Sequence, residues 1–220
     1  LAAATVIVSL AACGSDKREA SGRSEKTQEQ TAAADAEPAS DGKILIAYFT
    51  VAENSGVDAV SSASYSMVND KPVGRLRAIA DMIQAETGGE LFSIRTSVVY
   101  PADGGELIDY AANEQEEDVR PELTSHIEGL DKYGTVFVGF PNWWADLPQV
   151  LYSFFDEYDF SGKTIIPFNV HNGSRFSGTI ETIQELEPEA TVITDGFTVN
   201  ERDVPDAAGD VAGWLEEIGY

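Results

Sequence analysis

Lys43-Ile-Leu-Ile-Ala-Tyr-Phe49, followed by Thr50, is the stretch that decides the fold. After its first residue it is apolar and rich in β-branched and aromatic side chains, which is typical of a strand buried on both faces of a parallel sheet. Similar runs follow along the chain at Glu90–Arg95, Thr135–Phe140, Thr164–Phe168 and Thr191–Val199. The pattern therefore predicts five strands.

Helical stretches lie between these runs. The first, Pro72–Thr87, begins with a proline and stops at Gly88-Gly89, as helices often do. The other four are expected at Gly105–Asp118, Leu147–Tyr158, Phe176–Leu186 and Asp206–Ile218. Strands that alternate with helices in this way predict an α/β fold with a doubly wound, five-stranded parallel sheet.

The segments directly after the strands are the places to search for a ligand site. Doubly wound sheets bind ligands at the carboxyl ends of their strands, where the strand order reverses. Three segments qualify: Thr50–Lys71, Pro141–Ala145 and Asn169–Ser177. The first is rich in Ser, Asn, Asp and Gly, and a loop of its length in a compact domain is usually functional or disordered.

Four motifs together resemble the flavodoxin-like domain of bacterial lipoproteins and small flavoproteins. Besides the first strand they are Phe140-Pro-Asn-Trp-Trp144, Tyr158-Asp-Phe-Ser-Gly-Lys-Thr-Ile-Ile-Pro-Phe168 and His171-Asn-Gly-Ser174. The resemblance covers nearly all of residues 43–219. It implies the flavodoxin strand order 2-1-3-4-5 and an FMN site at the strand ends.

The loop Pro141-Asn142-Trp143-Trp144 is the candidate clamp for the flavin ring. FMN needs phosphate donors, a flat apolar clamp and polar groups at the ring edge. Two adjacent indoles on a loop do not easily both face the core, and backbone amides near Asn142 could reach the ring. The alternative is that the indoles cover the sheet or mark a protein-binding patch. Their place at a strand end favours ring contact.

A second contact with the ring is expected from the loop after the fourth strand. The resemblance implies that His171, Asn172, Gly173 and Ser174 contact the pyrimidine edge, where the glycine permits a close approach of the backbone. His171 is equally well read as a histidine held by structural hydrogen bonds. His126 lies in a polar stretch and is expected at the surface.

The phosphate end departs from the family pattern. The resemblance implies Gly-Asn-Thr at the helix start, where this chain has Gly74-Arg75-Leu76. Arg75 is either a bidentate phosphate ligand or a solvated residue of the first turn. The other candidate donors are the amides of the helix N-terminus together with Thr50, Ser55, Ser61, Ser62 and Ser64. The departure puts FMN affinity in question, though not the fold.

The residues before the first strand differ in composition from the rest. Residues 1–13 are apolar and end in Leu10-Ala-Ala-Cys13, which resembles a bacterial lipobox, so we expect a signal peptide, truncated at its start, and a lipid on Cys13. The alternative is a secretory signal with an incidental cysteine. Residues 14–42 predict a disordered linker. The domain, 43–220, is then expected outside the cytoplasm, held to the membrane by the lipid anchor alone.

The charge balance excludes some partners. The chain has 14 basic and 38 acidic residues, and the domain alone has 10 and 31, a net charge of −21. Nucleic acid is not an expected partner, because affinity for it comes largely from cationic neutralisation of phosphates. No His or Cys spacing suggests a metal site. With a single cysteine there is no thiol pair, so any electrons must be carried by a bound cofactor.

Three functions remain. The favoured one is an FMN-dependent, oxidoreductase-type electron carrier whose redox partner, a protein or a small molecule, the sequence does not identify. The first alternative is a binding or scaffold module that kept the flavodoxin fold and lost the flavin. The second is a flavin reductase that takes hydride from NAD(P)H and passes it to a quinone-type acceptor, although nothing in the sequence identifies a nicotinamide site.

Overall fold

The computed structural model describes residues 42–54 and 64–220. The predicted signal peptide, the lipid on Cys13 and nearly all of the predicted linker lie outside the described residues, as do Ser55, Ser61 and Ser62. These remain predictions. Within the described part of the chain, we find no helix with the length and apolar character needed to span a bilayer.

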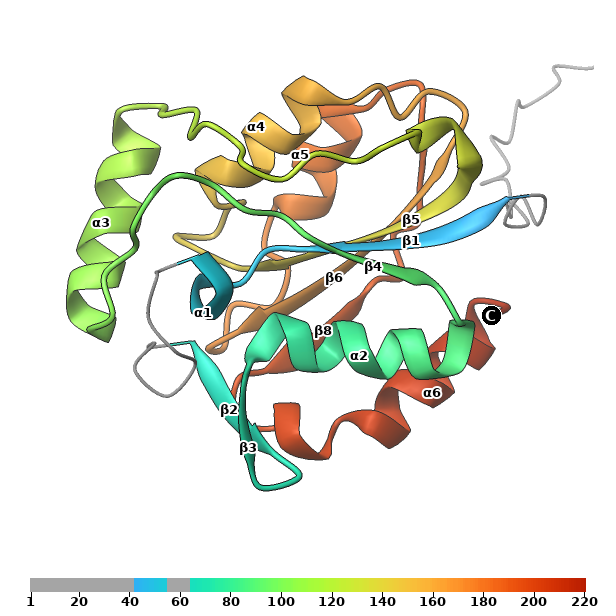
Figure 1. Cartoon of the computed structure of the whole chain (residues 1–220), viewed down its shortest axis with the longest axis horizontal. Helices are drawn as coiled ribbons and strands as arrows, with labels where there is room; N and C mark the ends of the chain where they lie inside the picture. The colour runs from blue at the N-terminus through green and yellow to red at the C-terminus, as the bar shows by residue number, and fades with distance from the viewer. Residues whose placement is uncertain (1–41, 55–63) are drawn as a thin grey trace, which may run out of the picture. The chain divides into compact units, whose positions relative to one another are not determined.

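Strands and helices alternate along the chain, as the sequence predicts (Figure 1). In chain order the elements are β1 Lys43–Tyr48, α1 Val51–Asn54, β2 Tyr65–Val68, β3 Lys71–Gly74, α2 Arg75–Thr87, β4 Glu90–Ser93, α3 Gly104–Glu116, the 3₁₀ helix η2 Leu130–Lys132, β5 Tyr133–Pro141, α4 Gln149–Glu157, β6 Thr164–His171, α5 Thr179–Leu186, β7 Thr191–Val192, β8 Phe197–Asn200, the 3₁₀ helix η3 Val204–Asp206 and α6 Ala208–Glu217.

The main sheet has the predicted order. β1 lies between β4 and β5, β6 follows β5, and β7 and β8 both pair with β6 at the far edge, all in parallel. Counting β7 and β8 as one edge position, this is the order 2-1-3-4-5. The register sets Ile46 beside Leu91 on one side and Phe137 on the other. The predicted fold class is therefore confirmed.

The fifth predicted strand, Thr191–Val199, is broken in two. β7 pairs with Thr164 and Ile165, and β8 resumes the pairing at Phe168. The gap falls beside Pro167, which has no amide hydrogen to continue a ladder. The tryptophan of α6 holds the chain in this gap, because the Trp214 indole Nε1 donates to the Asp195 carbonyl at 2.7 Å.

The two faces of the sheet carry separate apolar clusters. Alternate residues of β1 point to opposite faces, as the pleat requires. Ile46 belongs with Ile79 of α2 to the cluster under α2 and α6, whereas Leu45 and, just after the strand, Phe49 belong with Phe154 of α4 to the other cluster. Ile46 and Phe49 are both fully buried. Figure 1 shows α2 and α6 below the sheet and α4 and α5 above it.

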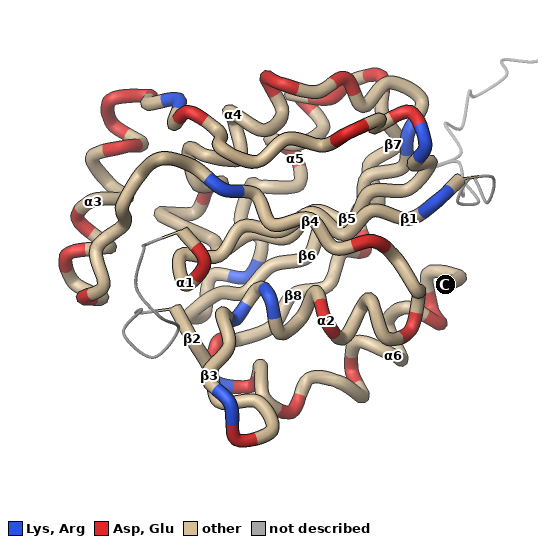
Figure 2. The backbone as a smooth tube through the Cα atoms, in the orientation of Figure 1, with Lys and Arg blue, Asp and Glu red and all other residues tan. Residues whose placement is uncertain are grey.

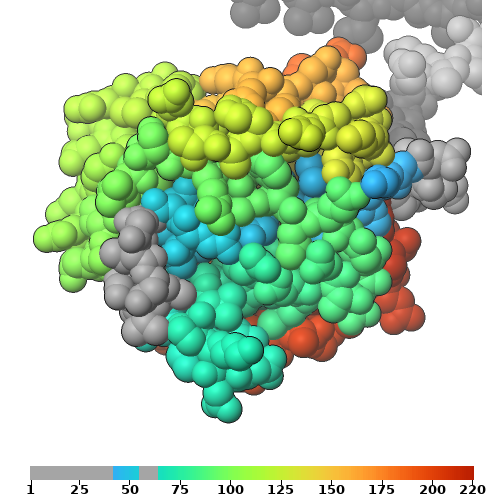
Figure 3. Space-filling view, viewed as in Figure 1, coloured from blue at the N-terminus to red at the C-terminus, as the bar shows by residue number. Residues whose placement is uncertain are grey.

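The prediction that a helix begins at Pro72 is wrong. Pro72 lies on β3, opposite Met67 of β2, in an antiparallel hairpin that projects beside α2 (Figures 1 and 3). The two-residue turn is Asn69-Asp70, with φ of 50° and 61°, which suits a tight hairpin. α2 begins at Arg75, after the hairpin. The predicted long loop Thr50–Lys71 therefore contains α1 and most of this hairpin.

Candidate functional site

A cavity of about 340 Å³ opens at the carboxyl ends of β1, β5, β6 and β8, beside the N-terminus of α2. Its volume is in the range of small-molecule sites, roughly 300–1,000 Å³. It lies where the strand order reverses, the position expected for a ligand in this fold. Its walls are formed by Thr50, Val51, Ser64, Arg75, Leu76, Gly104, Leu107, Ile108, Pro141, Asn142, Trp143, Val170, His171, Asn172 and Glu201.

The structure brings most of the predicted site residues to this cavity. Those on its walls are Thr50, Arg75, Pro141, Asn142, Trp143, His171 and Asn172. Trp144 and Ser174 instead line a neighbouring cavity. Gly173 lines neither, and Ser55 lies outside the described residues. His126 is exposed and contacts Glu157 at 2.7 Å, so its predicted surface position is confirmed.

The N-terminus of α2 forms one end of the cavity. Gly74 is the residue before the helix, and no described side chain caps the first turn. The Arg75 amide already donates to the Ser64 carbonyl at 3.0 Å. Amides in the first turn of a helix that have no acceptor within the helix suit an anion. Thr50 is buried, and its Oγ1 has no hydrogen-bond partner among the described residues. A Cβ on Gly74 would lie 2.6 Å from that oxygen, so the close approach requires glycine.

Arg75 is paired with an acidic residue that sequence reasoning missed. Its Nη1 lies 2.8 Å from Oε2 of Glu201, which follows β8 and also lines the cavity. Both side chains are largely buried, with exposed fractions of 22% and 28%. Arg75 is therefore not a freely solvated first-turn residue. No local signal in the sequence joins the two residues, because only the sheet order brings them together.

The two adjacent indoles have different environments. Trp143 packs edge-on against Phe49 and Tyr100, with ring centroids 5.7 Å apart in both pairs. Trp144 has an exposed fraction of 56%, and its Nε1 donates to the carbonyl of Ile108 in α3 at 3.0 Å. Trp143 therefore forms the apolar wall of the main cavity, while Trp144 faces outward beside it.

A tight turn from Trp143 to Asp146 points the two indoles in different directions. The Trp143 amide donates to the Asp146 carbonyl at 3.1 Å, and the Asp146 amide donates back at 2.9 Å. The two central residues, Trp144 and Ala145, have φ of 52° and 65°. This left-handed region is costly for residues with a Cβ. Strained backbone of this kind is often found at functional sites.

Replacing Ala145 with glycine is expected to raise the free energy of unfolding by roughly 0.5–1 kcal/mol, because glycine tolerates positive φ and the relief exceeds its greater entropy loss. Urea denaturation would measure the change. Ala112→Gly, in the helical backbone of α3, is the matched control and should lower stability by about 1 kcal/mol. A loss of stability in Ala145→Gly would contradict the assigned strain.

The loop after β6 is tied to the loop after β5. The Asn142 Nδ2 donates to the Arg175 carbonyl at 2.6 Å, and the Asn169 Nδ2 donates to the same oxygen at 2.8 Å. The Asn142 Oδ1 is buried and has no partner among the described residues. A buried acceptor without a donor is uncommon, and on a cavity wall a ligand can supply the donor.

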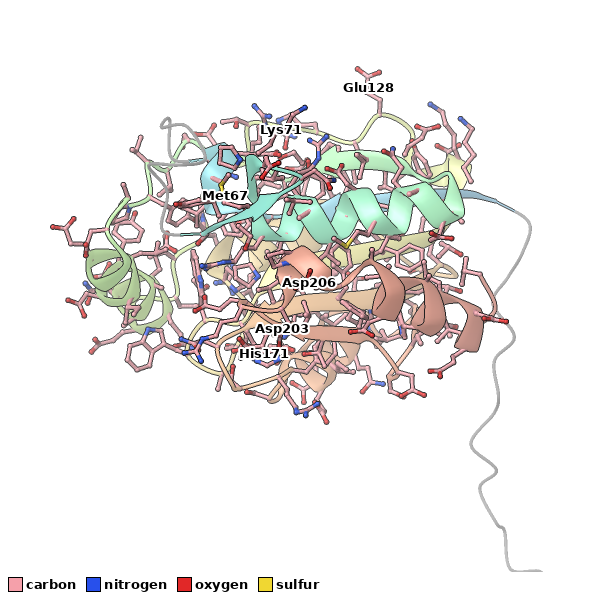
Figure 4. All side chains as sticks on the ribbon, turned by 90° about the horizontal axis from the view of Figure 1, so that it is seen from below. Met67, Lys71, Glu128, His171, Asp203 and Asp206 are labelled. Carbon is pink, nitrogen blue, oxygen red and sulfur yellow. The ribbon has the colours of Figure 1, made fainter. Side chains whose placement is uncertain are left out.

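His171 makes a hydrogen bond within its own loop and also lines the cavity. Its Nδ1 accepts from the Gly173 amide at 2.8 Å, and its ring lines the cavity. Burial lowers the pKa of His171, and Arg175 lowers it further, against the opposing effect of Asp203. Figure 4 shows His171 beside Asp203. The imidazole is therefore held neutral at pH 7, with the proton on Nε2 when Nδ1 accepts.

The comparison with known families decides the assignment. A family model described as flavodoxin matches residues 43–218. The chain belongs to the flavodoxin family. The resemblance found in the sequence motifs is thereby confirmed. Comparison with curated proteins gave no match for this flavodoxin.

Solved structures share the fold. A flavoprotein from Bacteroides uniformis ATCC 8492 is 25% identical, with a TM-score of 0.61, covering 80% of this chain and 98% of that one. A flavoprotein from Bacteroides eggerthii DSM 20697 is 22% identical, with a TM-score of 0.61, covering 81% and 99%. A flavoprotein from Lactobacillus acidophilus NCFM, solved in complex with FMN, is 16% identical, with a TM-score of 0.54, covering 76% and 99%.

Proposed function

We propose that this flavodoxin binds FMN in the cavity at the strand ends and carries electrons for a redox partner. The observation that carries the proposal is the composition of the cavity. One end has the N-terminus of α2, whose first turn no described side chain caps, with Arg75 and Thr50, and the other has an indole wall with Asn142 and His171. Phosphate donors at one end and a flat apolar wall at the other are what FMN requires. The FMN complex of the Lactobacillus acidophilus protein supports the same choice of ligand.

The residues of the cavity have separate roles in this proposal. The first turn of α2, Arg75 and Thr50 hold the phosphate. Trp143 borders the flavin ring, and Leu107 and Ile108 of α3 keep water from the cavity wall. FMN, when bound, supplies the electron-accepting ring, and no side chain forms a bond to the substrate. The neutral His171 presents a polar edge without adding a charge.

The protein's charge adjusts the electron affinity of the site. The domain has a net charge of −21, and Figure 2 shows acidic positions spread over the helices with few basic positions between them. An added negative charge is disfavoured in such surroundings, which lowers the reduction potential of a bound flavin. The same field attracts basic redox partners. We place the protein outside the cytoplasm on the basis of Leu10-Ala-Ala-Cys13, with a lipid on Cys13.

The test is a fluorescence titration of the purified protein with FMN and, separately, with riboflavin, which lacks the phosphate. We expect saturable binding of FMN and binding of riboflavin that is weaker by at least about 100-fold, because riboflavin loses the phosphate's hydrogen bonds to Arg75 and also those to the first turn and Thr50. Equal affinities would show that the phosphate end makes no contact. The absence of saturable FMN binding would overturn the proposal.

One observation favours a second candidate. Glu201 lies opposite Arg75 at the phosphate end and neutralises it in the structure. A carboxylate at this position repels a phosphate, so a module that has lost the flavin is the alternative. It predicts no FMN binding at any concentration tested. Oxidation of NADPH by the FMN-loaded protein alone would instead favour the flavin reductase.

A further inference from the structure

The inner face of α3 carries a carboxyl group at a core position. Three residues of this helix are buried, Leu107, Ala111 and Glu114. Their spacing of four and then three residues places them on one stripe of the helix, where globular proteins normally have apolar side chains. Leu107 belongs to the apolar cluster that contains Phe154, and Glu114 occupies the last position of the stripe, with an exposed fraction of 5%. α3 therefore packs on the domain through a face that contains an ionisable group.

The Glu114 carboxyl is buried without a compensating partner. Neither of its oxygens accepts a hydrogen bond from the described residues. Arg120 is the basic residue nearest to it along the chain, but its Nη1 lies 2.6 Å from Oδ1 of Asp118 and its Nε lies 3.2 Å from Oδ2 of Asp156. A buried carboxylate without a partner costs free energy, which favours the protonated form. Burial accordingly raises the pKa of Glu114 to about 7, so the group ionises near neutral pH.

The titratable groups around Glu114 do not change their charge with it. Tyr100, from the segment before α3, and Tyr110 of α3 both interact with Glu114, and burial followed by the Glu114 charge raises the pKa of both phenols. On the side of α4, the Tyr152 hydroxyl donates to Asp146 at 2.8 Å, and neither residue shifts the pKa of Glu114. The phenols stay neutral near pH 7, so the change of charge beneath α3 is that of Glu114.

α3 also forms one wall of the main cavity, through residues that include Leu107 and Ile108. The helix lies at the edge of the molecule in Figure 1. Two side-chain hydrogen bonds tie it to the turn after β5, from Trp144 Nε1 to the Ile108 carbonyl at 3.0 Å and from Gln115 Nε2 to Asp146 Oδ2 at 3.4 Å. A peripheral helix held by side chains, not by strand pairing, opens locally at a lower free-energy cost than the sheet. Outward movement of α3 would uncover this wall of the cavity.

We propose that Glu114 is a proton-binding site that controls α3 as a lid on the cavity: the bound proton keeps α3 closed, and its loss favours opening. The step is a deprotonation, in which the proton of the Glu114 carboxyl passes to water and the carboxylate gains hydration as the helix moves outward. Closed α3 holds the proton more tightly than open α3, so opening becomes more favourable as the pH rises from the pKa of the open state to that of the closed state. This inference goes beyond the proposed function and does not depend on FMN being bound.

The test measures amide hydrogen exchange in the full chain without added ligand, from pH 5 to pH 8, with correction for the intrinsic exchange rate. Opening of α3 should rise roughly 50-fold over this range and level off above pH 7, because the pKa of Glu114 falls from about 7 to 4.5 on opening. The indole hydrogen of Trp144, which is bonded to α3, should follow the same pH dependence. At pH 8, α3 should exchange at least about ten-fold faster than α2, which packs on the sheet through Ile79.

Glu114→Gln removes the proton site and keeps the side-chain volume, so exchange in α3 should stay slow and lose this pH dependence. Glu116→Gln, at an exposed position of the same helix, is the matched control and should keep the full rise. A rise that persists in Glu114→Gln overturns the proposal. Equal exchange of α3 and α2 at pH 8 also overturns it, because ionisation would then unfold the whole domain. A protein that shows the lid but binds no FMN overturns the proposed function alone.

Discussion

Replacing Arg75 with methionine is expected to weaken FMN binding about 100-fold while leaving riboflavin binding unchanged. A guanidinium forms two parallel hydrogen bonds with a phosphate, worth about 3 kcal/mol together, and methionine keeps much of the side-chain volume while removing both. Arg75 lines the cavity beside the first turn of α2, where this chain has Gly74-Arg75-Leu76 instead of the Gly-Asn-Thr that the resemblance implies. Parallel titrations with the two flavins would measure the effect.

Arg77→Met provides the control for charge alone. Arg77 lies two residues further along α2, forms an ion pair with Asp81 at 2.7 Å, and does not line the cavity. Its replacement should change FMN affinity by less than about three-fold. Equal losses in the two variants would mean that overall charge, not contact, holds the phosphate. The double variant Arg75→Met/Glu201→Gln keeps Glu201 from being left as an unpaired carboxylate, so a folding defect can be separated from a binding defect.

Replacing Glu114 with glutamine is expected to stabilise the protein by about 2–3 kcal/mol near pH 8 and to have little effect near pH 5. Glu114, on α3, is 5% exposed, and neither carboxyl oxygen has a hydrogen-bond partner among the described residues. Burial raises the pKa of Glu114 to about 7. A neutral amide avoids the cost of burying a charge.

The sign of this pH dependence follows from how the folded and unfolded states bind the Glu114 proton. The folded state holds the Glu114 proton up to a pH of about 7, whereas the unfolded chain loses it near the ordinary glutamate pKa of 4.5. The stabilising contribution of protonated Glu114 to the free energy of unfolding is fully present below the pKa of the unfolded state. It is lost as the pH rises through the pKa of the folded state. Urea denaturation at several pH values would measure it, with the exposed Glu116→Gln on the same helix as the control. A wild-type protein no more pH-dependent than Glu114→Gln would refute the assignment.

The strand pattern predicts the main sheet because its signal is local. Each buried run carries its own apolar composition, and the order of the sheet follows from the family motifs. The β2–β3 hairpin is missed because Pro72 at the start of a helical pattern favours a helix, while the turn residues Asn69 and Asp70 read as part of a loop. Proline is tolerated there because a two-stranded hairpin consists only of edge strands.

The site is predicted less completely, because its details depend on tertiary contacts. The motifs locate Asn142 and His171 on loops that line the cavity. They do not separate Trp143 from Trp144, whose opposite directions result from two positive φ angles. They also do not reveal Glu201 as the partner of Arg75, since the two meet only through the sheet. Leu107 and Ile108 are missed because α3 reads as an ordinary amphipathic helix.

The contact between Thr50 and Gly74 has a consequence for the segment between them. The chain leaves the sheet after β1 and comes back to the same point, with the Gly74 backbone directly against Thr50 and Ala52. α1 is fixed there, because the Asn54 side chain bonds the backbone of Ile94 and Thr96. Between these two fixed points the β2–β3 hairpin pairs only with itself, so lengthening it leaves the main sheet intact at a small entropic cost, about 0.6 kcal/mol for each doubling of a loop.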